Sequence, residues 1–112
     1  MKYSQKPKLE AICQTFLILV GVTDTNTLVE FINSHDFRLG PGLTRSELMI
    51  LLKRSPLIRW CKTPQGTVLY YLKGDEELVK GLVKDMLKEK YGDNNFLTDN
   101  ELDLEVMRYV KV

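Results

Sequence analysis

The chain has 112 residues, of which 44% are hydrophobic and 28% are charged, and its formal net charge is +1. This length fits one domain with one hydrophobic core, and the composition is that of an ordinary globular protein. The two cysteines, Cys13 and Cys61, are far apart and form no short pairing motif, which excludes a disulfide scaffold. We therefore expect buried thiols, a reducing compartment and a cytoplasmic protein.

Residues 8–20 form the first predicted helix, because apolar side chains recur on one of its sides. Gly21 ends this helix. The apolar run at 11–22 is too short to span a bilayer, and no small-residue cleavage motif follows it. We therefore expect neither a signal peptide nor contact with a membrane. The apolar side of the helix consists of Leu9, Ile12, Phe16, Leu19 and Val20.

Three stretches share one helix-start signal, a threonine followed three residues later by a glutamate: Thr27–Glu30, Thr44–Glu47 and Thr98–Glu101. In such a capping box the hydroxyl accepts a hydrogen bond from an amide of the first turn, and the carboxylate accepts one from the threonine amide. The first two signals predict helices over about residues 26–35 and 44–54. The second of these helices stops before a Ser-Pro pair, because the residue before a proline disfavours helical geometry.

A β-hairpin is predicted over residues 57–72, followed by a fourth helix over about 75–91 and an acidic segment, 93–112, with a short helix. Pro64 and Gly66 suit the turn of the hairpin. Trp60, Tyr70 and Tyr71 alternate along the paired strands and could stack on bases of a single strand of nucleic acid. Trp60 and Tyr70 are expected to point into the core instead, because aromatic side chains on a two-stranded sheet usually form its inner layer. The expected buried residues of the other helices are Leu28, Phe31 and Ile32, then Leu48, Leu51 and Leu52, and finally Leu78, Leu82, Val83, Met86 and Leu87.

The charge is divided unevenly along the chain. Residues 38–73 contain seven basic residues and one acid, Glu47, so this segment carries +6. Residues 74–112 contain ten acids and six basic residues, so this segment carries −4. A basic surface on the middle of the chain is typical of a protein that binds a polyanion.

The stretch "LTRSELMILLKRSPLIRWCKTPQGTVLYYLK", residues 43–73, combines a capped helix, a Ser-Pro break, a strand with basic residues, a Pro/Gly tip and an aromatic second strand. With the two helices before it, this order resembles the winged helix-turn-helix family of DNA-binding domains. The resemblance covers about residues 9–73 and implies an α+β, mostly helical fold. It would comprise a winged helix-turn-helix with a two-stranded β-hairpin wing in a domain at 1–92, and an additional C-terminal helix.

The resemblance implies that helix 44–54 enters the major groove of duplex DNA and that the 59–67 wing contacts the backbone. Arg45 is then placed to donate to a guanine, and Lys53 and Arg54 to bind phosphates. The expected DNA-binding residues are Arg45, Ser46, Lys53, Arg54, Arg59 and Lys62.

A transcriptional regulator that binds double-stranded DNA is the leading hypothesis, with a homodimer formed through the first helix or helix 76–90. The alternative is a winged-helix module for protein–protein interaction that binds no nucleic acid. Met49 and Ile50 support it, since a DNA-reading surface prefers polar residues; they face DNA, a protein partner or the core. A third hypothesis is that the acidic C-terminal segment covers the basic surface and gates binding.

No enzyme, cofactor or metal site is predicted. His35 is the single histidine and has only Asp36 beside it at ligand spacing, whereas a metal site needs more ligands. The "RLGPG" loop lacks the Gly-Lys-Ser/Thr of a phosphate-binding loop. Neither cysteine has a nearby basic partner that would mark a nucleophile.

Overall fold

The computed structural model of the chain describes residues 6–34, 44–91 and 98–110. The predicted α+β class is confirmed, as are the hairpin and the short helix near the C-terminus. His35 and the glycine-rich loop at 38–42 lie outside the described residues. The elements are, in order, α1 (Lys6–Val20), β1 (Val22–Asp24), α2 (Thr25–Ser34), α3 (Arg45–Leu52), β2 (Ile58–Lys62), β3 (Val68–Leu72), α4 (Glu76–Tyr91) and α5 (Asp99–Tyr109).

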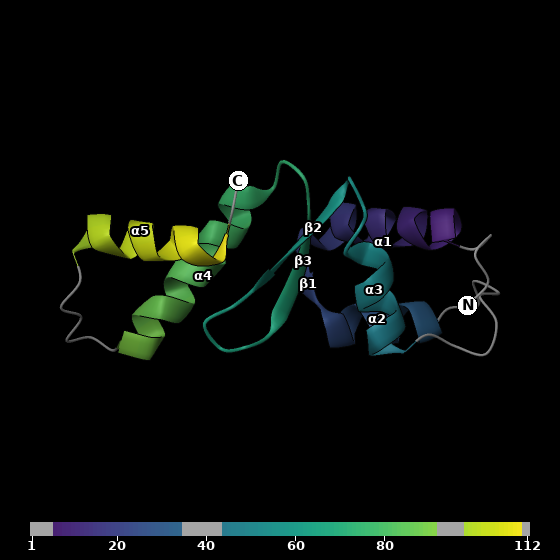
Figure 1. Ribbon diagram of the computed structural model, residues 1–112, viewed down its shortest axis with the longest axis horizontal. Coiled ribbons are helices and arrows are strands. Elements are labelled where there is room, and N and C mark those ends of the chain that lie inside the picture. Colours follow the sequence, from purple (N-terminus) through teal and green to yellow (C-terminus); the bar gives the residue numbers. More distant parts are fainter. Residues whose placement is uncertain (1–5, 35–43, 92–97, 111–112) are drawn as a thin grey trace.

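The strands form an antiparallel sheet of order β1-β3-β2, with β3 in the centre (Figure 1). Tyr70 of β3 pairs with Thr23 of β1 on one side and with Trp60 of β2 on the other. The prediction of two strands was therefore incomplete. β1 has only three residues, too few to show the alternation of apolar and polar side chains that marks a strand in a sequence. β2 pairs with β3 on one side only and is therefore an edge strand of the sheet.

The sheet lies between two hydrophobic cores, one on each face (Figure 1). Neighbouring residues of a strand point to opposite faces, so Tyr70 enters the first core while Leu69 and Tyr71 enter the second. The layered arrangement makes the molecule elongated, with extents of 50 × 22 × 22 Å. The first core also contains Leu9, Cys13, Leu17, Leu28, Ile32, Leu48, Leu52 and Ile58, from α1, α2, α3 and β2. The second also contains Cys61, Val79, Val83, Leu87, Leu102, Val106 and Val110, mainly from α4 and α5.

Two of the three predicted helix starts are confirmed. The Thr44 hydroxyl accepts from the Glu47 amide at 3.2 Å, and Thr98 and Glu101 form a complete capping box. The start predicted at Thr27 is wrong, because α2 begins at Thr25 and the Thr27 amide donates to Asp24 Oδ1 at 2.7 Å. An aspartate at the end of β1 thus supplies the cap, and Thr27 lies inside the helix.

The predicted apolar sides of α1 and α4 are only partly buried. Leu9 and Leu17 of α1 are buried, but Leu19 and Val20 are exposed. On α4, Val83 and Leu87 are buried, whereas Leu78 and Leu82 are exposed. The buried residues follow a spacing of four, Leu9-Cys13-Leu17 and Val79-Val83-Leu87, which selects a narrower side of each helix than the full set of apolar residues suggested.

Gly21 ends α1 as predicted and brings it close to α4. Its φ of +82° lies in the left-handed region that glycine adopts without strain, and its amide donates to the Leu17 carbonyl at 2.8 Å. A Cβ atom at Gly21 would lie 2.8 Å from Leu78 Cδ2. The end of α1 and the start of α4 are therefore neighbours on the surface.

Candidate functional site

The helix α3 turns one side toward the first core and the other toward solvent. Leu48 and Leu52 are buried, while Ser46, Met49 and Ile50 are exposed. The side chain of Ile50 is 68% exposed, so neither it nor Met49 belongs to the core. The predicted division of this helix is confirmed, and apolar side chains occupy the middle of its solvent side.

A groove of about 320 Å³ lies between this side of α3 and the hairpin. Its walls are mainly apolar, and Lys53 is its single charged residue. Burial raises the pKa of the Tyr70 phenol, which therefore stays neutral at physiological pH. The groove offers apolar surface with one cation at its rim. It is lined by Ser46, Met49, Ile50, Lys53, Trp60, Val68 and Tyr70.

Trp60 does not point into the core, contrary to the prediction, whereas Tyr70 does. The Trp60 side chain is 41% exposed, and Lys53 Nζ lies 5.6 Å from the centre of its ring, a cation–π contact. The two residues are paired across the sheet, but β3 is central and β2 is an edge. Helices cover the central strand, so Tyr70 is buried, while the indole on the edge strand stays at the rim of the groove.

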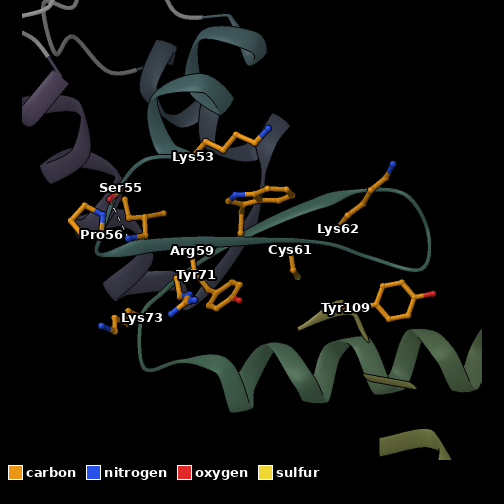
Figure 2. A pocket seen from close by; sticks show the side chains of 11 residues that line it. Lys53, Ser55, Pro56, Arg59, Cys61, Lys62, Tyr71, Lys73 and Tyr109 are labelled. Atoms are coloured by element: carbon orange, nitrogen blue, oxygen red, sulfur yellow. Dashed lines mark hydrogen bonds between the residues drawn. The ribbon is translucent and has the colours of Figure 1, made fainter. Parts of the chain in front are cut away.

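A second pocket of about 550 Å³ runs along β2. Lys53, Arg59, Lys62 and Lys73 line it, and no carboxylate does. Figure 2 shows Lys53 and Lys62 on one side of β2, and Arg59 and Lys73 on the other. The alternation of side chains along a strand explains why Arg59 and Lys62 lie on different sides. Four cations thus surround the edge of the sheet.

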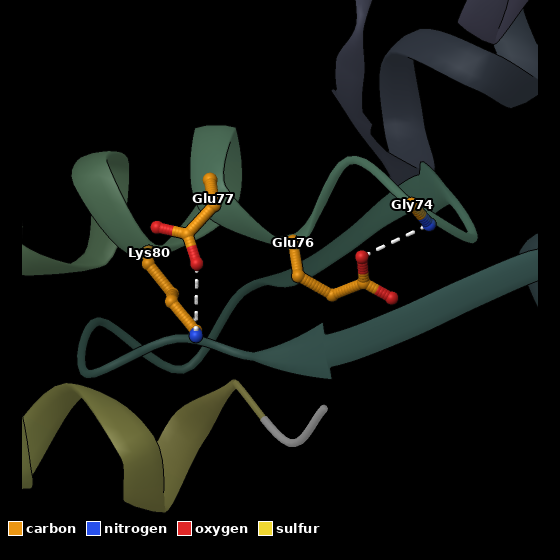
Figure 3. Close-up of polar contacts among 4 residues, drawn as sticks. All are labelled: Gly74, Glu76, Glu77 and Lys80. Carbon is orange, nitrogen blue, oxygen red and sulfur yellow. Dashed lines mark hydrogen bonds and ion pairs between the residues drawn. The ribbon is translucent and has the colours of Figure 1, made fainter.

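None of these four cations has an acidic partner among the described residues, whereas Lys80, Lys84 and Arg108 of α4 and α5 each have one. In the described part of the chain, the ion pairs are Lys80–Glu77 at 3.2 Å, Lys84–Asp103 at 2.9 Å and Arg108–Glu105 at 3.3 Å. Figure 3 shows the first of these beside Glu76, whose carboxylate accepts from the Gly74 amide at 2.9 Å. No such pair involves any basic residue between α3 and the end of β3 within the described ranges.

The backbone of β2 offers further polar groups at the same edge. Thr63 N donates to Thr67 O at 2.8 Å, and Lys73 N donates to Leu57 O at 2.9 Å. Hydrogen-bonded pairs alternate along an antiparallel ladder, so the backbone groups of Trp60 and Lys62 point away from β3.

Ser55, in the Ser-Pro break, prepares the start of this edge. Its hydroxyl donates to Glu10 Oε1 at 2.7 Å and accepts from the amides of Leu57 and Ile58 at 3.3 and 3.2 Å. The hydroxyl therefore links α1 to the beginning of β2. The Ser-Pro pair predicted the end of the preceding helix, but the sequence did not predict this link.

The structure brings together some of the six expected DNA-binding residues but not all of them. Ser46 and Lys53 line the groove, and Lys53, Arg59 and Lys62 line the edge pocket. Arg45 and Arg54 are exposed and line neither. Sequence analysis did not assign Lys73 or Trp60 to the site. Lys73 was already counted in the basic segment, so its position after β3 was the available signal.

The two cysteines are free and buried, as predicted. Burial raises the pKa of Cys13 to about 12, with a smaller contribution from the Glu10 carboxylate, and burial raises that of Cys61 to about 11. Both thiols therefore stay protonated at neutral pH. Among the described residues, no group of three or more His, Cys, Asp or Glu side chains is arranged to hold a metal ion. None of the helices described has the length and apolar character that a membrane crossing requires.

The arrangement is thus an apolar groove joined to a cationic strand edge, with Lys53 and Trp60 common to both. Its chemistry is that of binding anions and flat apolar groups. Comparisons with known proteins found no family model, no curated protein and no solved structure that matches the chain.

Proposed function

We propose that the protein binds DNA through α3 and the hairpin as a winged helix-turn-helix, and acts as a cytoplasmic transcriptional regulator. The observation that carries this proposal is the set of cations from Arg45 of α3 to Lys73, directly after β3. Within the described chain none of them pairs with a carboxylate, and four share one pocket. The order of three helices followed by an antiparallel hairpin adds support, because the resemblance rests on it.

Phosphates are the ligands that such cations bind. The side chains of Lys53, at the end of α3, and Lys62, in β2, lie on the same side of β2, next to the exposed side of α3. One strand of a duplex can therefore contact both. Arg45, in the first turn of α3, is placed to reach a base edge, and Arg54 to add a phosphate contact from the turn after α3. Each phosphate contact releases counterions, so binding must weaken as salt is added.

The test is a fluorescence-anisotropy titration of mixed-sequence duplex DNA at several salt concentrations. We expect affinity to fall steeply with salt, and the slope of log K against log [salt] to decrease by about 1 in Arg54→Ala and in Lys62→Ala. Lys88→Ala removes the same charge from the exposed side of α4 and should keep the wild-type slope. Absence of binding at low salt, or an equal change in the Lys88 variant, would refute the proposal.

The apolar groove favours a second candidate, a protein–protein interaction module. Met49 and Ile50 lie at the centre of the surface that would read bases, and Ile50 is largely exposed. An exposed apolar patch of this kind more often contacts a protein. Ile50→Lys separates the two functions, because the added cation keeps or strengthens DNA binding but abolishes the apolar contact with a protein.

A second copy of the chain is the partner that we propose for the exposed apolar residues of α1 and α4. Leu78 lies next to Gly21, so the exposed apolar residues at the end of α1 and the start of α4 adjoin there: Ile18, Leu19 and Val20 on α1, and Leu78 and Leu82 on α4. Gly81 lies between Leu78 and Leu82, and a Cβ atom there would meet nothing within 4 Å. In the dimer that we propose, a leucine of one copy fills the gap at Gly81 of the other, as a two-fold symmetric interface allows.

Sedimentation equilibrium tests the dimer. Leu78→Glu should give a monomer, whereas Leu104→Glu, at an exposed leucine of α5, should not. Gly81→Ala should weaken the dimer although it favours helix formation by about 1 kcal/mol in a monomer. A wild-type protein that stays monomeric at high concentration excludes this interface.

A further inference from the structure

Trp60 lies where the apolar groove and the cationic edge pocket meet. We propose that it stacks on an unpaired nucleobase, so that the site takes a single strand of DNA in preference to an intact duplex. This inference rests on the proposed function, because the base is held only if the nearby cations hold the phosphates. It departs from the proposed function in one respect, because that function takes duplex DNA, whereas the cations and Trp60 together favour a single strand.

The first step is the orientation of the indole. Trp60 is 41% exposed on the edge strand β2, and Lys53 is the cation over its ring. Aromatic side chains stack on unpaired bases whatever their sequence, because every base has a flat π face. A base in a duplex is already stacked on its neighbours and presents only its edge.

The second step is the chemistry of the groove beside Trp60. Reading a base pair by its edge needs hydrogen-bond donors and acceptors, but Met49, Ile50 and Val68 supply none from their side chains. The groove's 320 Å³ places it at the lower end of the size range of small-molecule sites, about 300–1,000 Å³. One flat ring system fits such a space, whereas the outer surface of a duplex would leave it empty.

The third step is the position of the cations relative to the indole. Lys62 follows Trp60 by two residues, so its side chain leaves the same face of β2 about 7 Å further along the strand. Lys53 lies on the same side of β2 as Lys62 (Figure 2), and its Nζ lies 5.6 Å from the centre of the indole ring. A strand that places one base on Trp60 can therefore bring phosphates on either side of this base toward Lys53 and Lys62. A basic track interrupted by an aromatic platform is typical of single-strand binding.

The sequence contains one tryptophan, so fluorescence excited at the red edge of the indole absorption, where the five tyrosines do not absorb, reports on Trp60. The test compares a dT12 oligonucleotide with a 12-base-pair duplex of mixed sequence, at the same salt concentration. We expect dT12 to quench the fluorescence of Trp60 and to bind more tightly than the duplex in an anisotropy titration. Trp60→Leu should weaken binding of dT12 by about 5-fold to 150-fold, and Trp60→Phe should keep most of the affinity.

The outcomes separate the two proposals. If the duplex binds, either an affinity for the duplex that equals or exceeds that for dT12, or the absence of quenching by dT12, overturns this inference and leaves the proposed function intact. No binding of either probe at low salt overturns both. Circular dichroism of Trp60→Leu checks its fold, and quenching and strand preference in the wild-type protein decide the question if this variant does not fold.

Discussion

The two halves of the molecule, on either side of the sheet, use their charges differently. On the side of α4 and α5, three of the basic residues pair with acids: Lys80 with Glu77, Lys84 with Asp103 and Arg108 with Glu105. From α3 to the end of β3, the basic residues have no acidic partner within the described chain, and they gather around an edge strand. Exposed ion pairs add little to stability, so the pairing alone is unimportant. The unpaired cations of the middle segment are the basis of the proposed DNA binding.

The two halves differ in the charges on their surfaces, but their cores are similar in composition. Each contains residues of the sheet, so the two helical layers are connected through β2 and β3. Lys62 on the exposed edge has a second effect, since a charged side chain there disfavours pairing with another strand. The following predictions test how far the halves are independent.

The largest effect is expected in the second core. Leu87→Ala should lower the free energy of unfolding by about 2–5 kcal/mol, because it leaves a cavity among α4, α5 and the sheet. Leu82→Ala, one turn earlier and partly exposed, should cost far less. If the halves unfold together, urea transitions of Leu87→Ala followed by Trp60 fluorescence and by circular dichroism coincide. Separate transitions would show that each core unfolds by itself.

Alkaline pH should lower the free energy of unfolding through a buried thiol in each half of the molecule. Cys13 belongs to the first core and Cys61 to the second, and burial raises the pKa of each thiol, to about 12 and about 11. The unfolded chain loses these protons near pH 9, whereas the folded chain keeps them, so stability is complete below pH 9 and falls between pH 9 and 11. The slope is about 1.4 kcal/mol per pH unit for each thiol.

Urea unfolding at pH 8, 9, 10 and 11 measures this loss. Burial also raises the pKa values of Tyr70 and Tyr71, which adds to the loss above pH 10. Both thiols should resist a thiol reagent at pH 8 in the folded state. A fast reaction of one of them would show that its half opens before the other.

The helix caps allow a smaller and matched comparison. Thr98→Ala removes the capping box of α5 and should cost about 0.5–2 kcal/mol. Thr44→Ala should have a similar cost at α3, where the Glu47 amide loses its acceptor. Thr27→Ala is the control, because Asp24 caps α2. Thermal denaturation gives all three values, and a large effect at Thr27 would contradict the assigned start of α2.

The smallest effect concerns the ion pair between α4 and α5. Asp103→Asn should cost about 0.2–1 kcal/mol, because both partners are partly exposed. The cost should decrease when the salt concentration is raised. Unfolding in urea at low and high salt measures it, and a salt-independent cost would mean that the residue acts by other means.

The sequence predicted those features that depend on neighbouring residues. The starts at Thr44 and Thr98, the end at Gly21, the turn of the hairpin and the exposed side of α3 all follow from local spacing. The winged-helix family, the DNA contacts and the homodimer remain predictions. The same holds for gating by the acidic segment, and a deletion of 93–112 would remove Leu102, Val106 and Val110 from the second core.

Features that depend on distant residues were missed. Trp60 and Tyr70 have similar neighbours in the sequence. Tyr70 is buried and Trp60 is exposed because Tyr70 lies on the central strand and Trp60 on an edge strand. β1 becomes a strand because β3 offers it a partner. Leu78 and Leu82 fit a helical stripe as well as Val83 does, and the packing of α4 on the sheet selects Val83.

The alternating ladder of β2 has a consequence for hydrogen exchange. The amides of Arg59, Cys61 and Thr63 point toward β3 and should exchange slowly with solvent, whereas those of Trp60 and Lys62 point outward and should exchange quickly. Slowly and rapidly exchanging amides therefore alternate along β2. Any molecule that covers the edge of β2 slows the exchange of the outward-pointing amides. Their exchange rates therefore show, residue by residue, whether the edge is covered.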